Sequence, residues 1–89
     1  MTNPTFIFDA EANGYISQSV RINGSALVHI VLESRAPIVI LKMCQNGEYA
    51  NYGQPPKSAT GFELTVHTKK EETVRLATPV QVTKCYILN

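Results

Sequence analysis

The chain of 89 residues has no tryptophan, only two cysteines and no long apolar run. Cys44 and Cys85 are too few for a disulfide framework and lack the spacing of a metal site. No apolar segment approaches the ~20 residues needed to cross a bilayer, and the start MTNPTFIF lacks the features of a secretion signal. We therefore expect a soluble protein with free, buried thiols and no membrane association.

The chain also lacks an excess of positive or negative charge. It has eight Lys and Arg residues and seven Asp and Glu residues, which gives a net charge of +1. No basic block is present, so a surface that follows phosphates would have to be assembled from scattered single charges. This composition disfavours a nucleic-acid partner.

Helical periodicity is absent as well, because no window holds a sustained apolar stripe at i, i+3, i+4 and i+7. Runs rich in Val, Ile, Thr and Tyr alternate instead with turn residues. The pattern predicts an all-β fold, a single antiparallel β-sandwich or flattened barrel of about seven or eight short strands over residues 1–89. The predicted strands are Thr5–Phe8, Tyr15–Ile22, Ala26–Glu33, Ile38–Cys44, Glu48–Tyr52, Phe62–Thr68, Thr73–Thr78 and Val80–Leu88.

Short connections between these strands predict hairpins. Asn-Gly pairs, which favour tight hairpin turns, occur at Asn13-Gly14, Asn23-Gly24 and Asn46-Gly47. The segments RINGSA, ESRAP and KKEE are also short enough to join antiparallel neighbours. The one long loop is 53–61, GQPPKSATG, whose paired prolines exclude a helix and a central strand.

Two predicted strands are apolar on both faces. Residues 26–32 place Leu27, His29 and Val31 opposite a second apolar set, and residues 38–44 repeat this pattern. A domain this small cannot bury both faces of a sheet, so the second face predicts a subunit interface. The predicted interface residues are Leu27, Val31, Ile38 and Ile40. The alternative is that the loop 53–61 or the N-terminal segment covers this face.

Residues for catalysis are isolated along the chain. His29 and His67 stand alone, the acids form no paired motif, and no serine lies in a nucleophile elbow. We therefore predict no catalytic, cofactor or metal site and no enzymatic activity. A small enzyme would require His, Cys and acid groups to converge in space.

Two tyrosines lie in the segment KMCQNGEYANYGQPPK, residues 42–57. Tyr49 and Tyr52, beside several amides, suggest a carbohydrate platform, because sugars stack on aromatic faces. At spacing i, i+3 on a strand, however, the two rings point to opposite sides. A carbohydrate- or receptor-binding module of a phage fibre, or a lectin-like domain, is therefore kept as the alternative function.

The order of features resembles small β-sandwich virion proteins of tailed bacteriophages, of the head-decoration, head-fibre or tail-accessory type. The resemblance is carried by SVRINGSALVHIVL (19–32), IVILKMCQNGEY (38–49), ETVRLAT (72–78) and KCYIL (84–88). The chain departs from the group where Tyr49 stands at a position often occupied by Trp, and in the ESRAP connection and the cysteines.

The resemblance implies a non-enzymatic decoration protein, made in the host cytoplasm and located in the virion. Its implied partner is the major capsid protein or another virion protein, bound as a homo-oligomer, often a trimer, without a cofactor. The predicted partner-binding loop comprises Tyr49, Tyr52, Gln54, Pro55, Pro56 and Lys57.

Overall fold

A computed structural model describes residues 2–55 and 57–89. These residues form nine β-strands and no helix. The strands are β1 (Phe6–Asp9), β2 (Gly14–Ser17), β3 (Val20–Ile22), β4 (Ser25–Ala36), β5 (Val39–Met43), β6 (Tyr49–Gly53), β7 (Ala59–His67), β8 (Glu72–Thr78) and β9 (Val82–Leu88).

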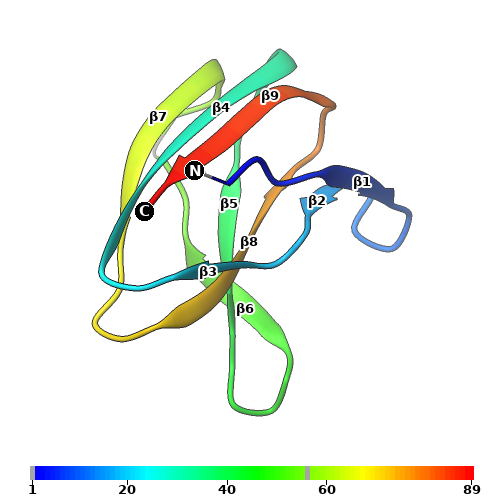
Figure 1. Ribbon diagram of the computed structural model, residues 1–89. Coiled ribbons are helices and arrows are strands. Elements are labelled where there is room, and N and C mark those ends of the chain that lie inside the picture. Colours follow the sequence, from blue (N-terminus) through cyan, green and yellow to red (C-terminus); the bar gives the residue numbers. More distant parts are fainter. Residues whose placement is uncertain (1, 56) are drawn as a thin grey trace.

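Two antiparallel sheets pack against each other (Figure 1). The large sheet has the order β1-β2-β8-β5-β6, with β3 also paired to β8. The small sheet has the order β7-β4-β9. The predicted all-β sandwich is confirmed. One predicted strand, Tyr15–Ile22, is divided into β2 and β3, which pair with different parts of β8.

The core lies between the two sheets and is lined chiefly by the inner face of β4. On that face Val28 and Ile30 are fully buried, and across the core Val74 and Leu76 of β8 are buried nearly as completely. Burial of an aliphatic side chain of this size contributes roughly 1.5–3 kcal/mol. The packing of the inner face of β4 against the large sheet therefore stabilises the fold through several such side chains.

Two of the predicted hairpins are confirmed. Asn46-Gly47 joins the paired strands β5 and β6, and Gly47 has a φ of +84°. Asn13-Gly14 joins β1 and β2, but here the asparagine takes the left-handed conformation, with a φ of +51°. Gly14 is needed for another reason, because a Cβ at this position would lie 2.8 Å from the carbonyl oxygen of Thr78.

The other predicted hairpins are wrong. The RINGSA segment carries the chain from β3 in the large sheet to β4 in the small sheet, and Gly24 turns it with a φ of +89°. ESRAP returns it to β5, and KKEE joins β7 to β8, again between sheets. A short connection can form either a hairpin or a corner between two sheets. Here it forms a corner, because the strands on its two sides pair with other strands rather than with each other.

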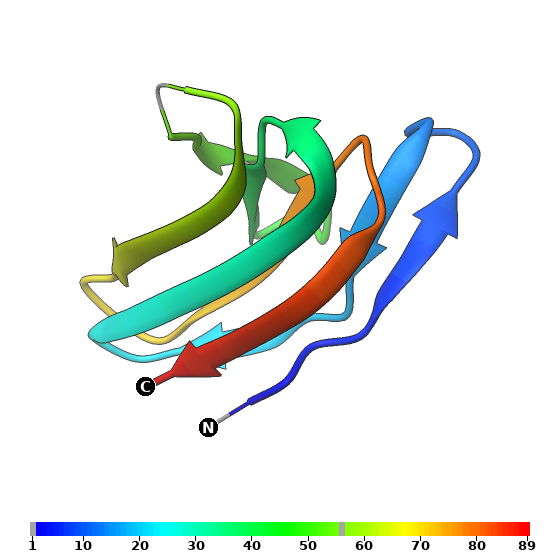
Figure 2. The same ribbon diagram turned by 90° about the horizontal axis from the view of Figure 1, so that it is seen from above.

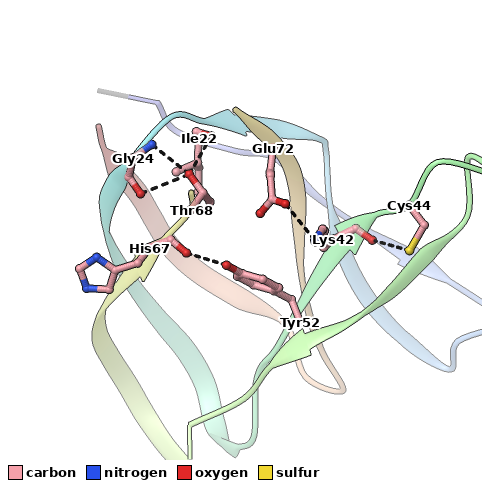
Figure 3. A network of polar contacts seen from close by, with 8 residues as sticks. All are labelled: Ile22, Gly24, Lys42, Cys44, Tyr52, His67, Thr68 and Glu72. Carbon is pink, nitrogen blue, oxygen red and sulfur yellow. Dashed lines mark hydrogen bonds and ion pairs between the residues drawn. The ribbon is translucent and has the colours of Figure 1, made fainter. Parts of the chain in front are cut away.

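Three buried hydroxyl groups hold the places where the chain changes direction. Thr68 is the most connected: its Oγ1 accepts from the N–H of Gly24 at 2.9 Å and faces the carbonyl oxygens of Gly24 and Ile22 at 3.2 and 3.4 Å (Figure 3). Ser17 Oγ accepts from the N–H of Leu76, and Thr78 Oγ1 donates to a carbonyl of the β4–β5 connection. Thr68 thus joins the β3–β4 corner to the β7–β8 corner.

We expect Thr68→Val to lower the free energy of unfolding by about 0.5–1.5 kcal/mol, because the hydrogen bonds of the Thr68 hydroxyl to the N–H of Gly24 and the carbonyl of Ile22 are lost while the side-chain shape is kept. Urea denaturation measures the change. The matched control is Thr65→Val on the exposed face of β7, for which we expect a change within about 0.5 kcal/mol. Equal stability of the two variants would show that the corner does not depend on this hydroxyl.

Candidate interaction surfaces

The outer face of the small sheet carries an apolar and aromatic patch. On β4, Leu27, His29 and Val31 point away from the core, and each is half-buried. The register places Leu88 of β9 beside Leu27, and Tyr86 beside His29. The imidazole of His29 stacks on the Tyr86 ring with centroids 4.7 Å apart and planes 14° apart. We call Leu27, His29, Val31, Tyr86 and Leu88 the small-sheet patch.

Polar residues surround this patch. Thr65 and Glu63 of β7 flank it on one side, and Lys84 of β9 on the other. Glu63 Oε2 lies 3.4 Å from Nδ1 of His29, which makes an ion pair only when the imidazole is protonated. The face therefore has an apolar centre and a mixed-charge margin.

Two of the four predicted interface residues do not lie on the surface. Ile38 is 0% exposed and Ile40 is 6% exposed, and both belong to the core. Their prediction as interface residues is wrong, because Ile38, just before β5, and Ile40, on β5, both turn their side chains inward. The outward face of that strand carries Val39, Leu41 and Met43.

Tyr49 lies on the outer face of the large sheet, within a polar cluster. Its hydroxyl is 2.7 Å from Ser19 Oγ, which also accepts from Nε of Arg75 at 3.2 Å. The guanidinium of Arg75 lies 4.6 Å from the centroid of the Tyr49 ring. One face of this ring is thus covered by a cation of the same chain.

Tyr52 lies on the other side and connects the two sheets. The register of β5 and β6 shifts after Ile40, so that Gly53 pairs with Ile40 and Asn51 pairs with Leu41, which leaves Tyr52 at the irregularity. Its hydroxyl donates to the carbonyl oxygen of His67 on β7 (Figure 3). The prediction that Tyr49 and Tyr52 point to opposite sides is confirmed, so they form no common platform.

The rest of the predicted partner-binding loop joins β6 to β7 and so passes from the large to the small sheet. Gln54 and Lys57 are exposed and Pro55 is half-buried, whereas Pro56 lies outside the residues that the structure describes. The assignment of this loop to a partner stays a prediction.

The hairpin of β1 and β2 carries a surface that the sequence reasoning missed. Ile7 is 68% exposed and Phe8 is 57% exposed, although both are large and apolar. Phe8 makes an edge-to-face contact with Tyr15, with centroids 5.4 Å apart. We call residues 6–17 the arm. The signal was the apolar triplet FIF, but its exposure depends on the edge position of β1.

Ionisable side chains are dispersed. In residues 2–55 and 57–89, no three His, Cys, Asp or Glu side chains lie close enough to hold a metal ion. The same residues contain no helix that is long and apolar enough to span a membrane.

The two cysteines, which were expected to be free and buried, are free but only half-buried. Burial raises the pKa of Cys85 to about 11.

An ion pair lies at one end of the core. Lys42 Nζ is 2.9 Å from Glu72 Oε1, and the Glu72 side chain is only 9% exposed (Figure 3). The hydrogen bond from Lys42 to this carboxylate, together with the attraction between the charges, raises the pKa of Lys42 above its ordinary value of 10.5. The pair allows a lysine to occupy the inward-facing side of β5.

No family model, curated protein or solved structure matches the chain.

The Lys42–Glu72 pair predicts a stability change in alkaline solution. Because the pKa of Lys42 is raised on folding, its contribution is fully present below pH 10.5 and is lost as the pH rises through the folded-state pKa. We expect Glu72→Gln to be less stable than the unchanged protein at pH 8, and this difference to shrink above pH 10.5. Urea unfolding across pH 8–12 measures it.

The neighbouring pair provides the control for this experiment. Arg21 and Glu71 are 3.5 Å apart and both are well exposed, and arginine stays charged throughout the range. We expect the stability difference caused by Glu71→Gln to be small and independent of pH. A constant difference for Glu72→Gln would contradict the coupling of Lys42 to Glu72.

Proposed function

We propose that the protein is a non-enzymatic structural part of a virion, a decoration protein that binds the assembled head of a tailed bacteriophage as a small oligomer. The observation that carries this proposal is the small-sheet patch, an exposed sheet face with an apolar and aromatic centre. The partner is the major capsid protein or another virion protein.

The form and composition of the patch favour a protein partner. A sheet face is broad, since its neighbouring strands lie about 4.8 Å apart and its side chains stand out in rows. Protein interfaces combine an apolar, aromatic-rich core with a polar rim, which is the arrangement of Leu27, Tyr86 and Leu88 inside Thr65, Glu63 and Lys84. A mixed-charge margin also suits a specific protein surface better than a polyanion.

The positions of Tyr49 and Tyr52 support carbohydrate binding less well than the small-sheet patch supports a protein partner. Tyr49 has one ring face beneath Arg75, and Tyr52 uses its hydroxyl to hold His67. The two rings lie on opposite sides and so cannot clamp one sugar. The order of strands and turns resembles small virion proteins of the head-decoration, head-fibre or tail-accessory type, and this resemblance supports a virion protein rather than a stand-alone lectin.

A decoration protein stabilises a capsid by mass action. Each bound copy favours the assembled lattice over free subunits, by about 2.7 kcal/mol per site when the free protein is at 100 times its dissociation constant. An oligomer presents more than one patch to a repeating lattice, so that binding at one site raises the effective concentration at the next.

The proposal is tested by co-sedimentation of the purified protein with undecorated, expanded heads of the phage that encodes it, beside a glycan panel. We expect saturable binding to heads and no binding to glycans. Binding to glycans without binding to heads would replace the proposal by the carbohydrate module.

Leu27→Asp tests the patch itself. Leu27 lies between Thr65 and Leu88, so that the new carboxylate has no cation opposite it and would be buried unpaired. We expect at least tenfold weaker binding to heads, with an unchanged fold by circular dichroism. Ser34→Asp, at an exposed position of β4 outside the patch, is the matched control and should bind normally. Equal binding by both variants would show that this face is not used.

A further inference from the structure

The arm ends in an unpaired strand. β1 is the terminal strand of the large sheet, and Figure 2 shows it at the rim of the molecule, with no strand on its outer side. Exposed edges of this kind are normally protected by charged residues, proline or a bulge. On β1 only Asp9, at the end of the strand, is of this kind, whereas Phe6, Ile7 and Phe8 are apolar.

The register shows which backbone groups of β1 face outward. The N–H of Gln18 donates to the carbonyl oxygen of Thr5 at 2.9 Å, directly across the β1–β2 ladder. Hydrogen-bonded and non-hydrogen-bonded pairs alternate in an antiparallel ladder. Ile7, opposite Ile16, therefore turns its N–H and C=O toward β2. Phe6 and Phe8 turn theirs to the open side.

The side chains of this edge are apolar on both faces. Ile7 points to the outer face of the sheet, and Phe8 points to the opposite face beside Tyr15. A flat surface can cover only one of these faces. An added strand covers both, because its own side chains alternate between the two faces.

We propose that β1 pairs antiparallel with β1 of a second copy of this chain, about a two-fold axis at Ile7. In this register Phe6 lies opposite Phe8 of the second copy, and the two residues exchange their outward N–H and C=O groups. The two Ile7 side chains form a non-hydrogen-bonded pair, the closer kind of pair in an antiparallel sheet. The two large sheets then become continuous across the axis.

The edge is complementary to itself in this register. Ile7 meets its own copy with Ile16 on each flank, which gives an unbroken apolar row. Asp9 lies opposite Thr5 of the second copy, so that no like charges face each other. A two-fold at Asp9 would instead place Asp9 against Asp9, and a two-fold at Phe8 would place the carboxylate of Asp9 against Ile7. The two-fold at Ile7 avoids both and keeps the apolar side chains together.

This dimer goes beyond the proposed function and does not depend on it. The arm belongs to the large sheet and the small-sheet patch to the other. Pairing at β1 leaves the patch of each copy free, so that the dimer presents two patches. Leu27→Asp is therefore expected to lose binding to heads while it remains dimeric.

Sedimentation equilibrium from about 10 µM to about 1 mM tests the pairing, a range in which small interfaces associate. We expect the unchanged protein to reach twice the 9.8 kDa mass of the chain. Ile7→Glu alone and Ile7→Lys alone should weaken the dimer at least tenfold, because each places like charges at the axis. Their equimolar mixture should associate again, since opposite charges then meet.

A second pair of variants tests the backbone bonds. Phe8→Ala removes the side chain and keeps the N–H, whereas Phe8→Pro also removes the N–H, which makes no bond within the monomer. We expect Phe8→Pro to weaken the dimer at least tenfold more than Phe8→Ala does. Circular dichroism and thermal unfolding check that each variant remains folded.

The pairing would be overturned by a monomer throughout the concentration range or by the trimer that the sequence resemblance implies. A dimer insensitive to both Ile7→Glu and Phe8→Pro would also overturn it, as would a mixture of the two charged variants that fails to associate.

Discussion

The packing of β4 against the large sheet is the contact on which the rest of the structure depends. Of its fully buried inner side chains, Val28 lies in one cluster with residues of β5 and β8, and Ile30 lies in a second cluster with Ile38, which precedes β5. A two-layer domain of this size has one interior, so that only one face of β4 can enter it. The outer face, with Leu27 and Val31, is left on the surface. The core and the small-sheet patch are thus two consequences of the same strand.

The sandwich also determines where side-chain hydrogen bonds are needed, at the corners between the sheets, and which strands lie at the edges of the sheets. Successive strands pass between the sheets, so corner residues such as Thr68 form hydrogen bonds with backbone groups of the neighbouring corner. At the edges, Tyr52 links β6 to β7, and the backbone of Thr2 pairs with Ile87 at the end of β9. Within the part of the chain that the structure describes, β1 has no comparable cover.

Local pattern predicted the strands well, because alternation and turn residues act within a few positions. Local pattern gave wrong predictions where the arrangement depends on pairing between strands that are distant in the sequence. A short turn fits a hairpin or a corner equally, so RINGSA, ESRAP and KKEE were misassigned. On β4 the polar His29 marked the outer face correctly. On β5 the inner face carries Lys42, whose charge is accommodated by Glu72, and that face was mistaken for surface. The exposure of Ile7 required the strand order, which local pattern does not contain.

Presence in the virion is the property that separates a decoration protein from a free binding module. The proposed function requires the chain to be present in purified phage virions, which quantitative mass spectrometry measures most directly. We expect the chain in many copies per head, in a constant ratio to the major capsid protein. Its absence from virions while it is abundant in the infected cell would contradict a structural role in the head.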